Sequence, residues 1–165
     1  MDKRQNFTIQ PIGLIHTPFT EVKNTPIQPF AAKGIRGWLD IDDEFTDGLV
    51  DVSGFSHITL LYLFHRITEH ALRVVPFMDT VERGIFATKA PKRPNRLGIS
   101  TVKLLGIIGN RVEIEEVDML DGSPLIDIKP FYPRYDNREN VKIGWLEKNR
   151  DYPVEKMRAD DRFSK

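Results

Sequence analysis

The residues best suited to chemistry lie in residues 84–100, GIFATKAPKRPNRLGIS, where a β-rich start turns abruptly basic. No acidic residue occurs between positions 84 and 112, while six basic residues fall there: Lys89, Lys92, Arg93, Arg96, Lys103 and Arg111. Proline fixes φ and removes a backbone donor, so Pro91 and Pro94 make this a stiff segment outside any sheet. A rigid cluster of cations indicates a binding site for an anionic ligand, although a basic loop can also be merely solvated.

Several other kinds of chemistry are excluded by what the sequence lacks. The chain has no cysteine, which removes thiolate catalysis and disulfides, and its four scattered histidines lack the spacing of zinc ligands. The glycine-rich motifs of dinucleotide and P-loop sites and the G-x-S-x-G motif of hydrolases do not occur. We therefore expect no metal, and a site that acts mainly by positioning its ligands.

Length and composition indicate a single domain of 165 residues, whose 40% hydrophobic content is ordinary for a globular protein. No apolar run approaches the ~18 residues of a membrane-spanning helix, and the first ten residues lack the apolar core of a signal peptide. We expect a cytoplasmic protein. The formal net charge is zero, but positions 40–51 form an acidic block without basic residues, apart from the basic segment. Such a separation of charge allows a local anion-binding face.

The elements that must position this segment are short and rich in β-forming residues. Strands are expected at residues 7–15, with Pro11 indicating an edge or bulged strand, at 35–41, at 55–64 as a central strand, at 84–88, and at 125–128. The Gly109-Asn110 pair predicts a hairpin between residues 99–108 and 111–117. Residues 42–52 can hold one short helix, and residues 67–82, after the central strand, are expected to form a loop. These elements predict a mostly β fold, a small antiparallel β-barrel with few short helices.

The β pattern fades after residue 136, and the end of the chain is mostly charged. We expect a barrel domain over residues 1–136. Residues 137–165 are expected to form a C-terminal extension that is partly mobile or packs on a partner chain.

Four motifs, taken together and in order, resemble the TsaA-like β-barrel family, whose characterised members include the TrmO tRNA methyltransferases. The motifs are IGLIHTPF, GFSHITLLYLFHR, GIFATKAPKRPNRLGIS and DMLDGSPLIDIKPFYP, and the resemblance covers about residues 7–136. Lys89 stands where many members have arginine, and Arg96 where they have proline. Bacterial members carry a further C-terminal domain associated with tRNA binding, whereas this chain stops soon after the last motif.

The resemblance implies methyl transfer from S-adenosylmethionine to N6 of the threonylcarbamoyl-modified adenosine at tRNA position 37, by a homodimer that binds the anticodon loop. It implies cofactor contacts from ten residues: Pro26, Ile27, Gln28, His65, Arg66, Lys89, Leu120, Asp121, Gly122 and Ser123. The catalytic candidates are His65 and Asp121, either of which could remove the N6 proton. The RNA-binding candidates are Lys92, Arg93, Asn95 and Arg96.

Two other readings of the sequence stay open. One is a non-catalytic β-barrel that binds nucleic acid or nucleotides. The other is a methyltransferase that uses the same cofactor on a small-molecule substrate.

Overall fold

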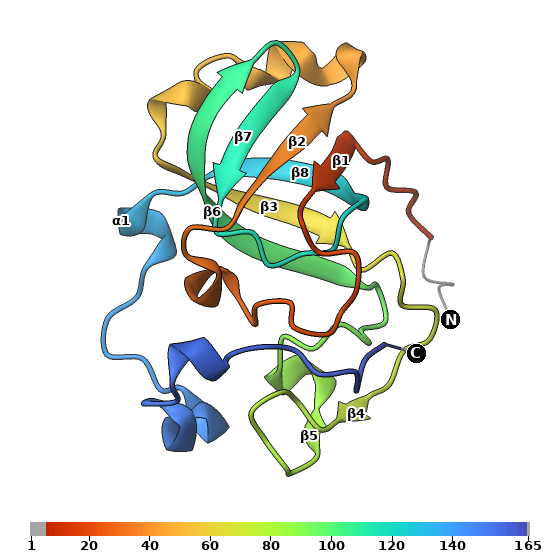
Figure 1. Cartoon of the computed structure of the whole chain (residues 1–165), viewed down its shortest axis with the longest axis vertical. Coiled ribbons are helices and arrows are strands. Elements are labelled where there is room, and N and C mark those ends of the chain that lie inside the picture. Colours follow the sequence, from red (N-terminus) through yellow and green to blue (C-terminus); the bar gives the residue numbers. More distant parts are fainter. Residues whose placement is uncertain (1–5, 165) are drawn as a thin grey trace.

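Six strands close into an antiparallel barrel in the computed structural model, which describes residues 6–164 (Figure 1). The strands are β1 (Gly13–His16), β2 (Arg36–Ile41), β3 (His57–Leu63), β6 (Leu97–Ile108), β7 (Arg111–Glu115) and β8 (Ser123–Pro130). Their order around the barrel is β1-β2-β7-β6-β3-β8, and every neighbouring pair is antiparallel. The predicted mostly β, barrel fold is confirmed.

The barrel core follows from a period-two alternation of side chains along each strand. In β3, Ile58, Leu60 and Tyr62 are buried while the residues between them are partly exposed. The same alternation buries Leu39 and Ile41 in β2. The register shifts once between β3 and β8 and once between β6 and β7, and such irregularities bend strands so that a sheet can close.

The hairpin expected from Gly109-Asn110 is confirmed as β6 and β7, and Gly109 has the positive φ, 61°, that a tight turn requires. The strand expected at residues 55–64 occurs as β3, which pairs with β6 and β8 as every strand of the closed barrel pairs with two neighbours. The helix expected within residues 42–52 occurs as the 3-10 helices η2 (Asp43–Leu49) and η3 (Val52–Gly54).

The remaining helical segments are equally short. They are η1 (Pro29–Ala32), η4 (Ile85–Ala87), α1 (Pro133–Asp136), η5 (Gly144–Asn149) and η6 (Val154–Lys156). No helix within residues 6–164 is long and apolar enough to cross a membrane.

Two expected strands were wrong in part. The strand expected at residues 7–15 is reduced to β1, which begins after Pro11 and is no edge, because it pairs with both β2 and β8. The strand expected at residues 84–88 is mostly η4. Only Gly84 belongs to a strand, in the two-residue ladder of β4 (Arg73–Val74) and β5 (Arg83–Gly84). The chain turns here because the backbone N–H and the hydroxyl of Thr88 both donate to the Ile85 carbonyl.

The chain after residue 136 runs back along the end of the barrel near β4 and β5 (Figure 1). Arg158 forms a β-bridge with Pro26, and the indole Nε1 of Trp145 donates to the Ala87 carbonyl at 2.7 Å. Phe163 is buried with residues of the 74–90 region. These contacts within one chain were not expected from the sequence, while the division at residue 136 and the packing on a partner chain stay predictions.

Candidate functional site

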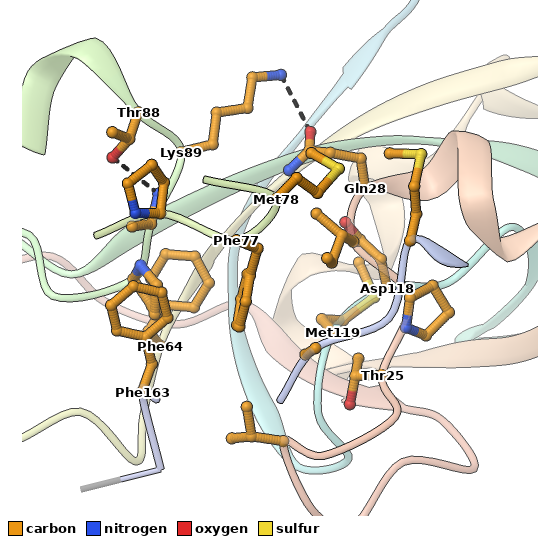
Figure 2. Close-up of a pocket in the computed structure, with 18 of the residues that line it drawn as sticks. Thr25, Gln28, Phe64, Phe77, Met78, Thr88, Lys89, Asp118, Met119 and Phe163 are labelled. Carbon is orange, nitrogen blue, oxygen red and sulfur yellow. Dashed lines mark hydrogen bonds between the residues drawn. The ribbon is translucent and has the colours of Figure 1, made fainter. Parts of the chain in front are cut away.

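A cavity of about 540 Å³ lies where the C-terminal segment meets the end of the barrel (Figure 2). Its walls come from five parts of the sequence: residues 22–30, 62–67, 76–91, 118–123 and 143–163. Small-molecule sites in proteins span roughly 300–1,000 Å³, so the cavity has the size of a binding site for a cofactor or nucleoside.

Most of the lining is apolar, and aromatic rings are fixed against one another. Phe77 packs edge-on against Phe163 with ring centroids 5.0 Å apart, and Tyr62 packs edge-on against Phe64 at 5.4 Å. Figure 2 shows Phe64, Phe77 and Phe163 on the same side of the cavity. Walls of this kind suit a flat aromatic group such as a nucleobase.

Polar groups meet at one point of the rim. The Lys89 ammonium donates to Oε1 of Gln28 at 3.1 Å, and Figure 2 shows this bond above the cavity. Gln28 has φ 73° and ψ 151°, a conformation that is rare for residues other than glycine and costs of order 1–3 kcal/mol. Strain of this kind persists where the surroundings impose it, commonly at ligand sites.

His65 and Arg66 follow β3 at the rim. Nδ1 of His65 lies 3.3 Å from the Ser123 hydroxyl, and Nη1 of Arg66 donates to the Thr20 carbonyl at 2.6 Å. Partial burial is the main cause that lowers the pKa of His65, and the Arg66 charge lowers it further. The Asp121 charge raises this pKa in part. His65 is therefore a neutral imidazole over more of the physiological pH range than an exposed histidine.

The cavity floor carries a polar chain that the sequence did not reveal. The Ser100 hydroxyl donates to Oδ1 of Asp118 at 2.7 Å and lies 3.2 Å from the Tyr62 hydroxyl. Burial raises the pKa of Asp118 to about 7, although the Ser100 hydrogen bond and the Lys89 charge lower it in part. Burial and the neighbouring Asp118 also raise the pKa of Tyr62, so its hydroxyl keeps its proton.

Asp118 is the only acidic side chain that lines the cavity within residues 6–164. The sequence offered one signal for it, since it opens the motif DMLDGSPLIDIKPFYP three residues before Asp121. Spacing alone could not say which of the two carboxylates faces inward.

Eight of the ten expected cofactor contacts line this cavity: Pro26, Ile27, Gln28, His65, Arg66, Lys89, Leu120 and Ser123. Asp121 and Gly122 do not. The Asp121 carboxylate accepts from the Thr17 N–H at 3.1 Å and lies 3.3 Å from Nδ1 of His16, and the Gly122 N–H donates to the Ile15 carbonyl. Their turn fastens β1 to the start of β8, so the geometry does not support Asp121 as a base within the cavity.

The four expected RNA contacts also lie outside the cavity lining. Nη1 of Arg93 donates to the carbonyls of Ile85 and Thr88 at 3.1 and 2.8 Å, and Nη1 of Arg96 donates to the Ile67 carbonyl at 2.7 Å. The two arginines therefore hold the basic segment in shape. Lys92 and Asn95 make no side-chain hydrogen bond within the described part of the chain.

Metal chemistry has no support in the described residues, because no group of three or more histidine, cysteine or acidic side chains is placed to hold an ion. The polar groups of the cavity are an ammonium, two guanidinium groups, an imidazole, hydroxyls, amides and one carboxyl. This set suits a ligand that combines an aromatic base, hydroxyls and charged groups.

Comparisons with known proteins give the following matches. Residues 14–137 match the family model of the tRNA-methyltransferase O N-terminal domain. A probable S-adenosyl-L-methionine-binding protein of Pyrococcus abyssi is 53% identical over 154 residues, which cover 93% of this chain and 83% of that protein. A tRNA (adenine(37)-N6)-methyltransferase of Mus musculus is 32% identical over 145 residues, 84% of this chain and 34% of that protein.

A solved structure is similar as well. The crystal structure of TrmO from Pseudomonas aeruginosa superimposes with a TM-score of 0.75 and 34% sequence identity. The match covers 86% of this chain and 63% of that one, so the chain spans less than two thirds of the solved protein.

Proposed function

The chain belongs to the family of the tRNA-methyltransferase O N-terminal domain, and from this premise we propose that it transfers a methyl group from S-adenosylmethionine to N6 of an adenosine in tRNA. The proposed target is adenosine 37 carrying the threonylcarbamoyl group. One observation carries the proposal: eight of the ten residues that motif position assigns to the cofactor line a single cavity of suitable size.

The lining residues fit S-adenosylmethionine by their chemistry. The Lys89 ammonium suits the carboxylate of its methionine part, the aromatic walls suit its adenine, and the Gln28 amide and Ser123 hydroxyl suit its ribose. When bound, S-adenosylmethionine supplies an electrophilic methyl group on a sulfonium. The protein contributes by holding the target nitrogen in line with that methyl group, since near-attack geometry alone lowers such a barrier substantially.

An adenosine in an anticodon loop is unpaired and can be splayed into a pocket without melting a helix. Lys92 and Asn95 are the proposed RNA contacts whose side chains make no hydrogen bond in the described chain, and they adjoin the Lys89–Pro91 part of the rim. Arg93 and Arg96 would act indirectly by keeping this segment rigid. A homodimer and a boundary near residue 136 belong to the same proposal, and the family match ending at residue 137 supports the boundary.

The test is an incubation of the protein with S-adenosylmethionine and tRNA that carries the threonylcarbamoyl adenosine, followed by digestion and mass spectrometry of the nucleosides. We expect one added methyl group on that nucleoside and none on tRNA lacking the modification. Absence of methylation at saturating donor would reject the proposal. Binding of S-adenosylmethionine without RNA methylation would favour a small-molecule substrate, and RNA binding without donor binding would favour a non-catalytic barrel.

A pair of lysine variants tests the cavity itself by calorimetry. Lys89→Ala removes a rim cation, and loss of a charge-assisted hydrogen bond of roughly 1.5–3 kcal/mol predicts at least ~10-fold weaker donor binding. Lys103→Ala removes an exposed lysine of β6 outside the cavity and serves as the matched control. Equal affinities of the two variants would place the donor away from Lys89.

A further inference from the structure

The hydrogen-bond chain on the cavity floor has a defined direction. The Ser100 hydroxyl has one proton, which it donates to Oδ1 of Asp118 at 2.7 Å. The contact of 3.2 Å between Ser100 and Tyr62 must therefore have the Tyr62 hydroxyl as its donor. The Tyr62 hydroxyl from β3 thus donates to Ser100 from β6, and Ser100 donates to one carboxyl oxygen of Asp118, which orients the Asp118 side chain.

The second oxygen of Asp118, Oδ2, is left for a ligand. Within residues 6–164 no other residue donates a hydrogen bond to Oδ2. Because no buried side-chain oxygen in that range lacks a partner, Oδ2 is not a buried atom. Asp118 is partly accessible and lines the cavity, so Oδ2 is reached from the cavity side. A carboxyl oxygen that is held by its neighbours and open toward a ligand has the geometry of a proton acceptor.

The charged groups around Asp118 come from several elements. Tyr62 faces it from β3, and Lys89 acts on it from the segment after η4. The other ionisable residues of the lining are His65, Arg66, Arg150 and Tyr152. Burial raises the pKa of Asp118 to about 7, while the Ser100 hydrogen bond, its own backbone N–H and the Lys89 charge lower it in part. This value lies within the range in which a carboxylate can exchange a proton at neutral pH.

Resting on the proposed function, we infer that Asp118 is the catalytic base that takes the N6 proton on Oδ2, and that Ser100 and Tyr62 are positioning residues that orient it. The lone pair of N6 forms the new N–C bond while the methyl C–S bond breaks and leaves its electron pair on sulfur. The N6–H electrons remain on nitrogen, and the proton passes to Asp118 and then to solvent when the products leave. We do not assign this role to Asp121, because its carboxylate is outside the cavity lining and its Oδ1 contacts Thr17 and His16.

The experiment compares single-turnover methylation of modified tRNA from about pH 5.5 to about pH 9, at saturating S-adenosylmethionine. The wild-type rate should rise with pH and level off as Asp118 ionises. Asp118→Asn should lower the plateau by ~100-fold or more, remove this rise, and leave calorimetric donor affinity within about threefold. Asp47→Asn, on the exposed face of η2, is the matched control and should behave as wild type.

Ser100→Ala provides the second test, because it keeps the carboxyl and removes only its donor. Loss of that hydrogen bond destabilises the carboxylate, so the midpoint of the pH profile should move to higher pH. A carboxyl ¹³C NMR titration of Asp118 in the free protein should move in the same direction, and this readout does not depend on activity.

Three results would overturn the assignment. The first is a methylation rate of Asp118→Asn equal to wild type, and the second is an Asp118→Asn variant with lower donor affinity but an unchanged rate at saturating donor. The third is a Ser100→Ala variant in which neither the pH–rate profile nor the carboxyl ¹³C titration has a shifted midpoint. If the wild type itself methylates no RNA, the proposed function fails and the assignment falls with it. An active wild type with an equally active Asp118→Asn refutes the assignment alone.

Discussion

The Asp118→Asn substitution should stabilise the fold at alkaline pH, even though it removes a proposed catalytic group. In the folded protein, burial raises the pKa of this carboxyl from 3.8 to about 7. Asparagine has nearly the same shape and its side-chain oxygen can still accept the Ser100 hydrogen bond, but it cannot ionise. The variant therefore removes the cost of burying a charge and keeps the packing.

The sign and size of the effect follow from linkage. Well below a pH of 3.8, Asp118 is protonated in both states and adds no difference in stability. As the pH rises from there toward 7, the unfolded chain ionises first and the folded state loses stability. A difference of about 3 pKa units at 1.36 kcal/mol each gives an upper limit of about 4 kcal/mol. Because the carboxyl has an accessible side in the cavity, we expect about 1–2 kcal/mol to be lost between about pH 5 and about pH 8.5.

The assay is urea unfolding of wild type, Asp118→Asn and the exposed control Asp47→Asn at both pH values. The difference in unfolding free energy between Asp118→Asn and wild type should grow toward alkaline pH, while the Asp47→Asn difference should stay constant. Parallel losses of stability in wild type and Asp118→Asn would show that Asp118 has an ordinary pKa, and the reasoning about the buried carboxyl would be refuted.

Two further substitutions test the packing of the site. Gly98→Ala should destabilise the fold by ~1–3 kcal/mol in urea unfolding, because a Cβ there would lie 2.4 Å from Cζ of Tyr62. Gly106→Ala on the same strand places its Cβ where nothing lies within 4 Å, so it should cost much less. Equal losses of stability in the two variants would contradict this explanation. Trp145→Ala should weaken the binding of S-adenosylmethionine, measured by calorimetry, by ~10-fold, because Trp145 lines the cavity. Trp38→Ala lies outside the lining and should leave the affinity unchanged. Equal affinities of the two variants would show that the donor does not contact residues 143–163.

The barrel could be predicted from the sequence because its signals are local. The short, β-rich hydrophobic run at residues 55–64 and the Gly109-Asn110 turn each determine an element without help from distant parts of the chain. The expected strand at residues 84–88 failed because its β-forming residues compete with the two hydrogen bonds that Thr88 makes to Ile85. Such a local side-chain bond overrides propensity, and hydrophobic pattern does not report it.

The site could be predicted only as a set of motifs. The family resemblance located the rim residues Gln28 and Lys89, but it did not distinguish the inward Asp118 from Asp121, because that difference depends on how β1 and β8 pair. The structural role of Arg93, whose side chain donates to the carbonyls of Ile85 and Thr88, could not be predicted either. In the sequence, such an arginine does not differ from any other cation of a basic segment.

The cavity has two parts, the barrel side and the side formed by residues 143–163, and their sequences can diverge independently among relatives. Residues 143–163 supply one side of the cavity, yet they lie beyond the part of the chain that the family model covers. A relative could thus acquire a different tail and a different fit for its nucleoside while the barrel, with its motifs, is inherited intact. Exchanging tails between relatives is accordingly a direct route to engineered variants with altered ligand preference.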